Sequence, residues 1–215
     1  MRNVALSRTD RFINGLDRVL RTLWGKPQGT ERPNPAGHTH HDHTLSDDER
    51  RRSGCLMRVN FAGEVAAQAL YHGQGLFARD ASVARRMQHA ADEENDHLAW
   101  CRARLEALET RPSLLNPFWY LGAFSIGAGA GIVGDAASLG FLEETEAQVV
   151  RHLDRHLKRL PEKDAASRRV LEQMRADEAR HGRNARDAGA VRPAPPVRTA
   201  MKLASRVMTG TAYWI

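Results

Sequence analysis

The sequence predicts an all-α protein whose core is an antiparallel bundle of four long helices. Apolar residues recur at alternating steps of three and four through four long stretches. No segment alternates apolar and polar residues with the period of a half-buried strand. Two of the four stretches contain a Glu-x-x-His pair at matching places, Glu94 with His97 and Glu178 with His181. Paired motifs of this kind on facing helices are typical of bundles that hold two metal ions.

Residues 8–24 have the pattern of a short basic amphipathic helix, with apolar residues on one side and arginines on the other. Such a helix either packs on the domain or lies in a membrane interface, and the sequence leaves both interpretations open. A linker rich in Gly, Pro and Asn follows at 25–45. It contains the histidine-rich run HTHHDH at 38–43. In this breaker-rich setting, a solvated loop is favoured over a metal site.

The first long helix is expected to begin at Ser46. The run SDDE forms a capping box, in which Ser46 is the N-cap and Glu49 is the third helical residue. The later helices end before or at Pro and Gly residues, which do not continue a helix. The four predicted helices cover about 46–78, 81–109, 136–160 and 163–188.

Residues 112–134, between the second and third predicted helices, contain no charged side chain. The segment has the length of a membrane span, yet Pro117 and its glycines make it a poor simple span. We expect an apolar crossover that joins the two helical hairpins and dips into a bilayer. The stretch 198–215 is basic and amphipathic and ends in Tyr, Trp and Ile, and Tyr and Trp favour a membrane interface.

The predicted organisation therefore has three parts. Residues 1–45 form the basic N-terminal segment with its histidine-rich linker, and residues 46–190 form the four-helix bundle with the crossover. Residues 191–215 form a C-terminal amphipathic helix that associates with a membrane. Peripheral or monotopic membrane association is expected from these flanking helices together with the crossover.

The overall composition narrows the classes of partner. The 215 residues suffice for one domain with its own core, and the net charge of +6 suits an anionic lipid surface or nucleic acid. Nucleic acid is not expected as a partner, because the chain lacks the interleaved basic and aromatic residues that stack on bases. Cys55 and Cys101 give no disulfide framework, which favours a reducing, cytoplasmic setting.

Each of the four apolar stripes contains one glutamate near its middle. These residues are Glu64, Glu94, Glu146 and Glu178, and in two stripes a histidine follows one turn later. Four carboxylates buried together would repel one another unless something neutralises them. Two divalent cations supply that charge, and two neutral imidazoles complete the ligand set. Ligands of this type, without thiolate, suit iron or manganese better than structural zinc. The competing interpretation is a structural polar seam of Glu–Arg pairs.

The third helix offers two candidate ligands, Glu144 and Glu146. The segments Phe61–His72 and Phe141–His152 have identical residues at matching positions, and this internal echo aligns Glu144 with Glu64 and so favours Glu144. The apolar stripe favours Glu146, because Glu144 points about 200° away around the helix. We follow the stripe, since a ligand must point inward.

Imidazoles that bind metals usually donate their second N–H to an acceptor. Glu93 and Asp177 each directly precede a motif glutamate and are candidate acceptors. For Glu93 a solvated surface position is the favoured interpretation, and for Asp177 the two are equally supported. Tyr71 and His152, on or near the inner faces, are further candidates.

Several long runs resemble the demethoxyubiquinone hydroxylase family of ubiquinone biosynthesis in its bacterial form, within the ferritin-like di-iron superfamily. The runs are LMRVNFAGEVAAQALYHGQ, ADEENDHLAWC, RPSLLNPFWY, TEAQVVRHLDRHL and LEQMRADEARH. The resemblance covers almost the whole chain. Carried over by position, the family's catalytic iron ligands fall on Glu64, Glu94, His97, Glu146, Glu178 and His181.

The resemblance implies a ferritin-like di-iron monooxygenase with two iron ions per chain, bound peripherally to the cytoplasmic side of the inner membrane. Its substrates would be O₂ and 2-polyprenyl-3-methyl-6-methoxy-1,4-benzoquinol. The electron donor stays open, with NADH and a reduced quinone as candidates. Candidate protein partners are other proteins of ubiquinone biosynthesis and a second copy of the chain.

Two alternative functions share parts of this pattern. A ferritin-like ferroxidase or iron-binding protein would use the same ligands, but it would not need an uncharged crossover. A nicotinamide-binding protein is suggested by GAGIVG at 129–134, which satisfies Gly-x-Gly-x-x-Gly. No strand precedes that run, so small residues for close helix packing are its favoured explanation.

Overall fold

The structure is a computed structural model that describes residues 8–25, 29–30, 32–37 and 45–215, with the side chains of 8–12 and 14 excepted. Within these residues every regular element is a helix. The seven helices are α1 (Arg8–Leu23), α2 (Asp47–Phe77), α3 (Ala81–Ala107), α4 (Asn116–Val133), α5 (Asp135–Arg159), α6 (Ala165–Asp187) and α7 (Pro195–Ala212). The predicted all-α fold is confirmed. The histidine-rich run at 38–43 lies outside the described residues.

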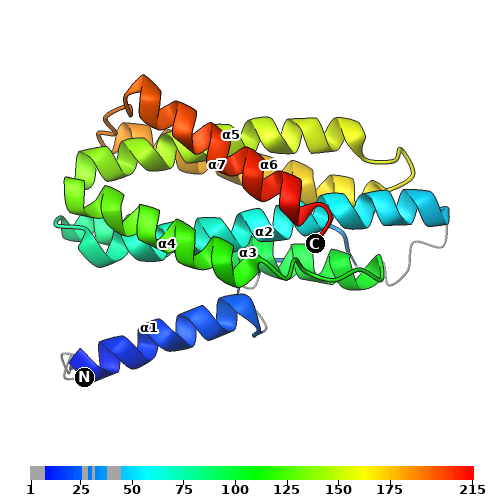
Figure 1. Cartoon of the computed structure of the whole chain (residues 1–215), viewed down its shortest axis with the longest axis horizontal. Helices are drawn as coiled ribbons and strands as arrows, with labels where there is room; N and C mark the ends of the chain where they lie inside the picture. Colours follow the sequence, from blue (N-terminus) through cyan, green and yellow to red (C-terminus); the bar gives the residue numbers. More distant parts are fainter. Residues whose placement is uncertain (1–7, 26–28, 31, 38–44) are drawn as a thin grey trace.

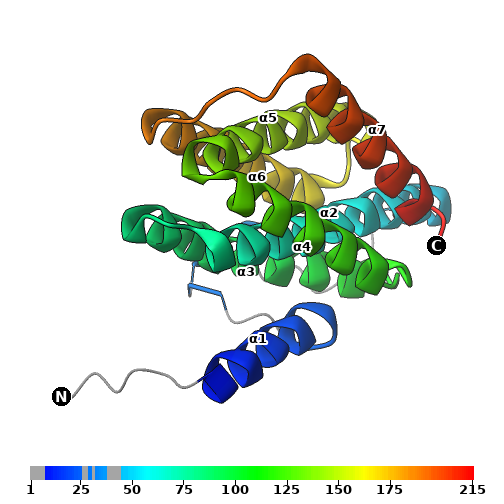
Figure 2. The ribbon, with the colours of Figure 1, turned by 60° about the vertical axis from the view of Figure 1, so that its left-hand side comes forward.

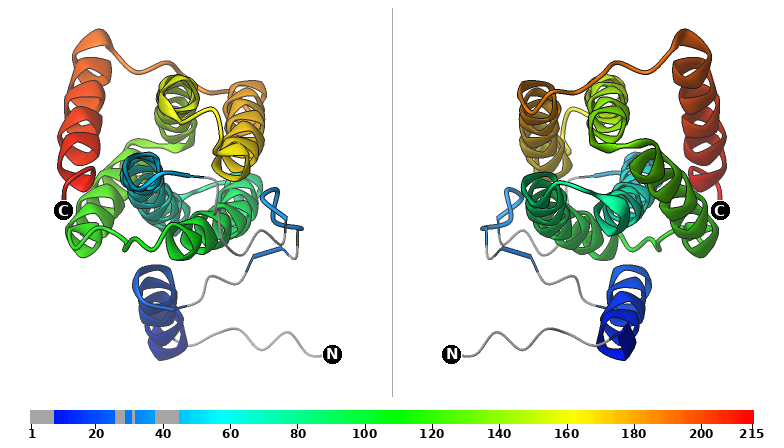
Figure 3. Two further views of the ribbon diagram at one scale, coloured as in Figure 1. Left: turned by 90° about the vertical axis from the view of Figure 1, so that its right-hand side faces the viewer. Right: turned by 90° about the vertical axis from the view of Figure 1, so that its left-hand side faces the viewer.

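Two helical hairpins, α2–α3 and α5–α6, pack against each other to form the bundle (Figure 1). The view along the bundle in Figure 3 places these four helices around a common centre, with α4 and α7 on the outside. The crossover helix α4 packs mainly along α2 and leads directly into α5. Figure 2 shows α7 returning on a long link and running back across the outside of α5 towards α2.

Local sequence signals set the ends of the four bundle helices, which lie within about two residues of the predicted bounds. The capping box at the start of α2 is present, with Ser46 accepting from the Glu49 backbone and the Glu49 carboxylate accepting from Ser46. Asp80 and Asp164 cap α3 and α6 by accepting backbone N–H groups. Each cap uses residues close together in the chain, which explains why the sequence pattern could locate the one at Ser46.

Close approach between α2 and α4 explains the glycines of the crossover. A Cβ atom at Gly127 would lie 2.4 Å from the Leu70 carbonyl oxygen, and one at Gly73 would lie 2.4 Å from that of Phe124. At Gly131 the approach is looser, and a Cβ atom would lie 3.1 Å from the Gln74 carbonyl oxygen. Most of the run 129–134 therefore lies at the end of α4, in a helix and not in a strand–turn–helix unit. Within GAGIVG, close helix packing explains Gly131, whereas Gly129 has no neighbour within 4 Å and Gly134 ends the helix with a φ of 137°.

The flanking helices expose much of their apolar surface. Along α1, the side chains of Ile13, Leu16 and Leu20 are exposed, whereas Val19 and Leu23 pack against the core. Helix α1 therefore has a side packed on the core and an exposed apolar side. Figure 3 shows this helix lying beside the bundle and outside its four central helices. Further exposed apolar residues lie on α4 and α7 and beyond their ends: Leu114, Phe118, Leu121, Ile126, Ile132, Val133, Val197, Leu203, Val207, Trp214 and Ile215. No helix in the described part of the chain combines the length and apolar character that a membrane crossing requires.

Candidate metal centre

All six predicted ligand residues meet at the centre of the bundle. Helix α2 provides Glu64 and α5 provides Glu146, whereas α3 and α6 each provide a glutamate and the histidine one turn later. Each of the six residues is at least 96% buried. The side chains converge because every one of them lies on the inward stripe of its helix, midway along the bundle.

Two overlapping groups of ligand atoms form around the two imidazoles. In the first, one atom from each of Glu64, Glu94, His97 and Glu178 lies within 4.8 Å of the others. In the second, the same holds for Glu146, Glu178 and His181. The two imidazole rings are 6.5 Å apart between centroids. The buried centre can therefore hold metal ions, and its donor atoms divide into two neighbouring sets.

Glu94 and Glu178 each face both imidazoles. Glu94 places Oε2 at 3.1 Å from His97 Nδ1 and Oε1 at 3.4 Å from His181 Nδ1. Glu178 places Oε1 at 3.2 Å from His97 Nδ1 and Oε2 at 3.2 Å from His181 Nδ1. A carboxylate that directs one oxygen towards each of two metal positions is suited to bridge them. Glu64 lies beside His97 only, with Oε2 at 3.3 Å from Nδ1.

On the outer side, each histidine faces a carboxylate acceptor on the other helix, across the contact between α3 and α6. His97 Nε2 on α3 lies 3.1 Å from Asp177 Oδ2 on α6, and His181 Nε2 on α6 lies 2.7 Å from Glu93 Oε2 on α3. Each Nε2 can donate to its acceptor, which leaves each Nδ1 free to face the centre. The surface position favoured for Glu93 was wrong, because its side chain is only 14% exposed and bonds to His181. The partner lies on another helix, so the sequence pattern of α3 could not reveal it.

Two arginines that the sequence reasoning missed hold this outer layer. Arg180 Nη1 lies 2.7 Å from Asp177 Oδ1 and its Nη2 lies 2.8 Å from Glu93 Oε1, so one guanidinium spans both acceptors. Arg32 Nη2 lies 2.6 Å from Asp177 Oδ2. The spacing of three between Asp177 and Arg180 could have indicated the first pair. Nothing in the local sequence marks Arg32, which lies in the linker before α2.

The structure separates the two glutamates of α5 that the sequence left in competition. Glu146 points into the centre and its Oε1 accepts from the Tyr71 hydroxyl at 2.7 Å. Glu144 points towards the outside, where it accepts from Arg198 at 3.0 Å and Gln148 at 3.0 Å. The direction of Glu146 agrees with the stripe argument and not with the internal echo. The His152 ring lies beside that of His156, and its Nε2 is 3.3 Å from Asn60 Oδ1 on α2.

Burial and the neighbouring charges shift the pKa of the carboxyl and imidazole groups in this cluster. Burial and repulsion from neighbouring carboxylates raise the pKa of Glu64 and of Glu146 well above the usual range. Although burial opposes ionisation of Glu94 and Glu178, the two imidazoles hold the pKa of both carboxyls below the usual range. Burial also opposes charge on His181, but hydrogen bonds to Glu178, Glu93 and Glu94 raise its pKa to about 12.

The donor set fits two divalent cations. Among the described residues, buried Glu64 Oε2 and Glu94 Oε1 have no hydrogen-bond partner, and both oxygens face an imidazole nitrogen across the centre. Four carboxylates and two neutral imidazoles balance the charge of two such ions. A metal ion would replace the protons that the cluster otherwise holds. A structural seam of Glu–Arg pairs fits less well. Among the described residues, the inner glutamates Glu64, Glu94 and Glu178 form ion pairs with the two histidines and with no arginine or lysine.

Comparison with known proteins gives a consistent picture. The family model described as "Ubiquinone biosynthesis protein COQ7" matches residues 51–212. The chain is 54% identical over 210 residues to the 3-demethoxyubiquinol 3-hydroxylase of Nitrosococcus oceani, covering 98% of both chains. It is 55% identical to the enzyme of the same name from Ralstonia pickettii, covering 96% of this chain and 99% of that one. The Cupriavidus necator enzyme of that name is 56% identical, over 96% of this chain and all of the other.

Proposed function

The chain belongs to the ubiquinone biosynthesis protein COQ7 family, and we propose that it is a monooxygenase that hydroxylates a demethoxyubiquinol in ubiquinone biosynthesis. The substrate would be a 2-polyprenyl-3-methyl-6-methoxy-1,4-benzoquinol, and O₂ would supply the oxygen atom. The observation that supports this most directly is the pair of buried Glu/His groups that share Glu178, with Glu94 also facing both imidazoles. The chain that forms them is more than half identical to enzymes of that name.

Two iron ions are the metals we propose for the centre. Glu64 and His97 would hold one ion, Glu146 and His181 the other, and Glu94 with Glu178 would bridge them. When bound, the irons would supply the redox chemistry that activates O₂. Ligands made only of carboxylate and imidazole suit iron.

The surrounding residues would set the geometry of the centre and keep water away from it. Asp177 and Glu93 accept from Nε2 of the two histidines, which fixes the ring orientation and directs Nδ1 inward. The Tyr71 hydroxyl donates a hydrogen bond to Glu146 Oε1, which fixes the orientation of that carboxylate. The buried side chains around the cluster, including Met87, Leu142 and Met174, exclude bulk solvent and strengthen electrostatic interactions inside.

We further propose that the protein associates peripherally with the cytoplasmic side of the inner membrane. A polyprenyl quinol resides in the bilayer, so its hydroxylase must reach the lipid. The exposed apolar residues of α1, α4 and α7 support this proposal. Trp119 of α4 and Tyr213 beyond α7 pack together against Val59 and Ala62 of α2, one turn before Glu64. We propose this junction as the side from which the quinol approaches the metal centre.

The test is anaerobic reconstitution with Fe²⁺, followed by addition of O₂, a reductant and a short-chain demethoxyquinol. The expected result is about two irons per chain and a hydroxylated quinol, detected by mass spectrometry with ¹⁸O₂ as the label source. Running the assay in parallel with NADH and with a reduced quinone identifies the electron donor. Rapid oxidation of Fe²⁺ without quinol hydroxylation would instead identify a ferroxidase and contradict the proposal.

A further inference from the structure

A segment before α2 crosses the seam between α3 and α6, the two helices that contain the Glu-x-x-His pairs. We call residues 29–30 and 32–37 the strap. On α3, the buried carboxylate of Asp96 accepts from the Thr30 backbone N–H at 2.6 Å and from the Thr30 hydroxyl at 2.5 Å. On α6, Arg169 donates to the carbonyl oxygens of Pro35 and Ala36, at 3.0 Å each. The strap is therefore attached to both helices (Figure 3).

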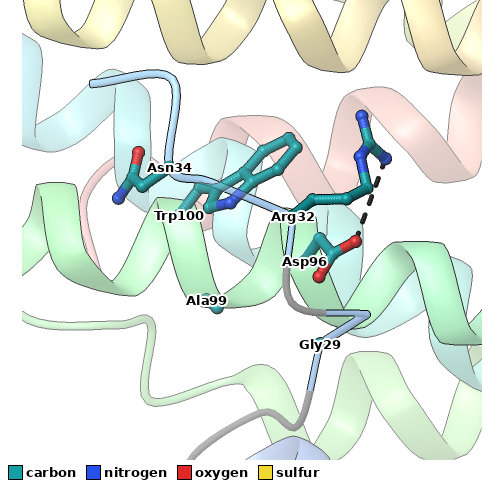
Figure 4. Close-up of a pocket in the computed structure, with 6 residues that line it drawn as sticks. All are labelled: Gly29, Arg32, Asn34, Asp96, Ala99 and Trp100. Atoms are coloured by element: carbon teal, nitrogen blue, oxygen red, sulfur yellow. Dashed lines mark ion pairs between the residues drawn. The ribbon is translucent and has the colours of Figure 1, made fainter. Parts of the chain in front are cut away.

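Arg32 is the strap residue that reaches the outer layer of the metal centre. Its Nη2 lies 2.6 Å from Asp177 Oδ2, the oxygen that also faces His97 Nε2 at 3.1 Å. Its Nη1 lies 3.8 Å from Glu93 and 3.9 Å from Asp96, so three carboxylates surround one guanidinium. The guanidinium also stacks on Trp100, 4.9 Å from the ring centroid (Figure 4).

The charges explain why a cation is needed at this place. Glu93, Asp96 and Asp177 add three negative charges just outside a centre that already contains four carboxylates. Arg180 reaches Asp177 through Oδ1 and leaves Oδ2 to His97 and Arg32. Arg32 therefore fixes the very oxygen that orients His97, whereas Arg180 fixes the other oxygen of the same carboxylate.

We propose that Arg32 is a positioning residue for the metal centre. It fixes the orientation of the Asp177 carboxylate, so that His97 directs Nδ1 towards the centre of the bundle. Metal binding would then depend on the docked strap. This inference rests on the proposed function only in assuming that the centre binds Fe²⁺. Because Arg32 comes from the segment that follows α1, docking of the N-terminal region and assembly of the metal centre are coupled.

The neighbouring cavity allows a clean substitution. A cavity of about 300 Å³ lies beside the guanidinium and is lined by Gly29, Arg32, Asn34, Asp96, Ala99 and Trp100 (Figure 4). A glutamine or lysine at position 32 therefore fits without overpacking. The matched control is Arg175→Gln on α6, which removes an exposed ion pair with Asp154 and touches none of the residues of the metal centre.

The experiment measures the Kd for Fe²⁺ anaerobically in the full chain, by competition with a chromophoric chelator, together with urea unfolding of the metal-free protein. We expect Arg32→Gln to raise the Kd about tenfold, as loss of an outer hydrogen-bond partner does at metal sites. Arg32→Lys, which keeps the charge, should recover most of the affinity. Arg175→Gln should leave the Kd unchanged.

If the Kd of Arg32→Gln stays within about twofold of the wild-type value, the inference is overturned, because loss of an outer partner changes metal affinity by more than that. This holds whatever the change in the urea midpoint. If Arg32→Gln does not fold, Thr30→Ala is measured in its place, because it removes a hydrogen bond that holds the strap and keeps Arg32. A raised Kd for Thr30→Ala then supports the inference, and an unchanged Kd overturns it. A wild-type protein that binds no Fe²⁺ would overturn the inference and the proposed function together. Tight Fe²⁺ binding without quinol hydroxylation would refute only the function.

Discussion

At the residue scale, the direction of one side chain on α5 decides which carboxylate can bind metal. Glu146 is buried and bonded to Tyr71, whereas Glu144 pairs with Arg198 on the outer side. We expect Glu146→Ala to lose about one of the two irons, because it removes the only carboxylate proposed to serve the second metal alone. Glu144→Ala should keep both. Iron per chain, measured by mass spectrometry after anaerobic reconstitution, distinguishes the two variants; full iron in Glu146→Ala with loss in Glu144→Ala would reverse the assignment.

The outer residues show what a sequence stripe leaves undecided. Periodicity places Glu94 and His97 inward because both lie on one apolar face of the same helix. Glu93, one position earlier, lies about 100° away around the helix, at the edge of that face. Whether such an edge position is solvated depends on the neighbouring helix, and here α6 brings His181 to it.

At the element scale, the contact between α2 and α4 depends on glycine. A methyl group at position 127 would meet the Leu70 carbonyl, and backbone atoms cannot move aside as a flexible side chain can. We expect Gly127→Ala to lower the free energy of unfolding by about 1–3 kcal/mol through overpacking.

Gly129→Ala is the matched control two residues along the same helix, where nothing lies within 4 Å of the added methyl group. It should be neutral or stabilise by up to about 1 kcal/mol through helix propensity. Urea unfolding measures both variants. Equal stability of the two would show that α4 does not approach α2 as closely as described.

Helix α7 exposes a stripe that we assign to the lipid surface. Leu203 is 62% exposed and Val207 is 51% exposed, and Trp214 follows two turns later. Replacing Leu203 and Val207 together by glutamine keeps the net charge and removes apolar surface, so binding to vesicles should weaken. Deleting 198–215 should release the protein further. Cosedimentation with anionic vesicles measures both, and unchanged sedimentation would exclude α7 as an anchor.

At the scale of the whole molecule, stability depends on pH through the buried His156 and the partly buried His72 and His152. Burial lowers the pKa of His72 to about 4, of His152 to about 4 and of His156 to about 2, from an ordinary value of 6.5. Below that ordinary value, the unfolded chain takes up protons that the folded chain excludes, so stability falls as the pH falls. The contribution is complete above 6.5 and is lost progressively towards the folded-state values.

His156→Leu tests this dependence, because it removes an imidazole that is stacked on His152 at 3.9 Å. The urea midpoint of the wild type should drop between about pH 7 and about pH 5, within the range where histidine titrates. The drop should be smaller in His156→Leu. Both proteins retain all the other titrating groups, and of these His152 is in ring contact with the substituted position. An equal drop in both would contradict the role assigned to His156.

The four bundle helices, the cap at Ser46 and the inward direction of the six glutamate and histidine residues follow from sequence pattern alone. These features depend on residues close together in the chain, where a period of 3.6 and a capping hydroxyl act locally. Which helices face one another depends on tertiary packing. That packing brings Asp177 to His97 and Glu93 to His181, places α4 close to α2, and brings Arg32 to Asp177. Those contacts join residues far apart in the sequence, and their geometry depends on how the packed helices are rotated and spaced, which no local pattern encodes.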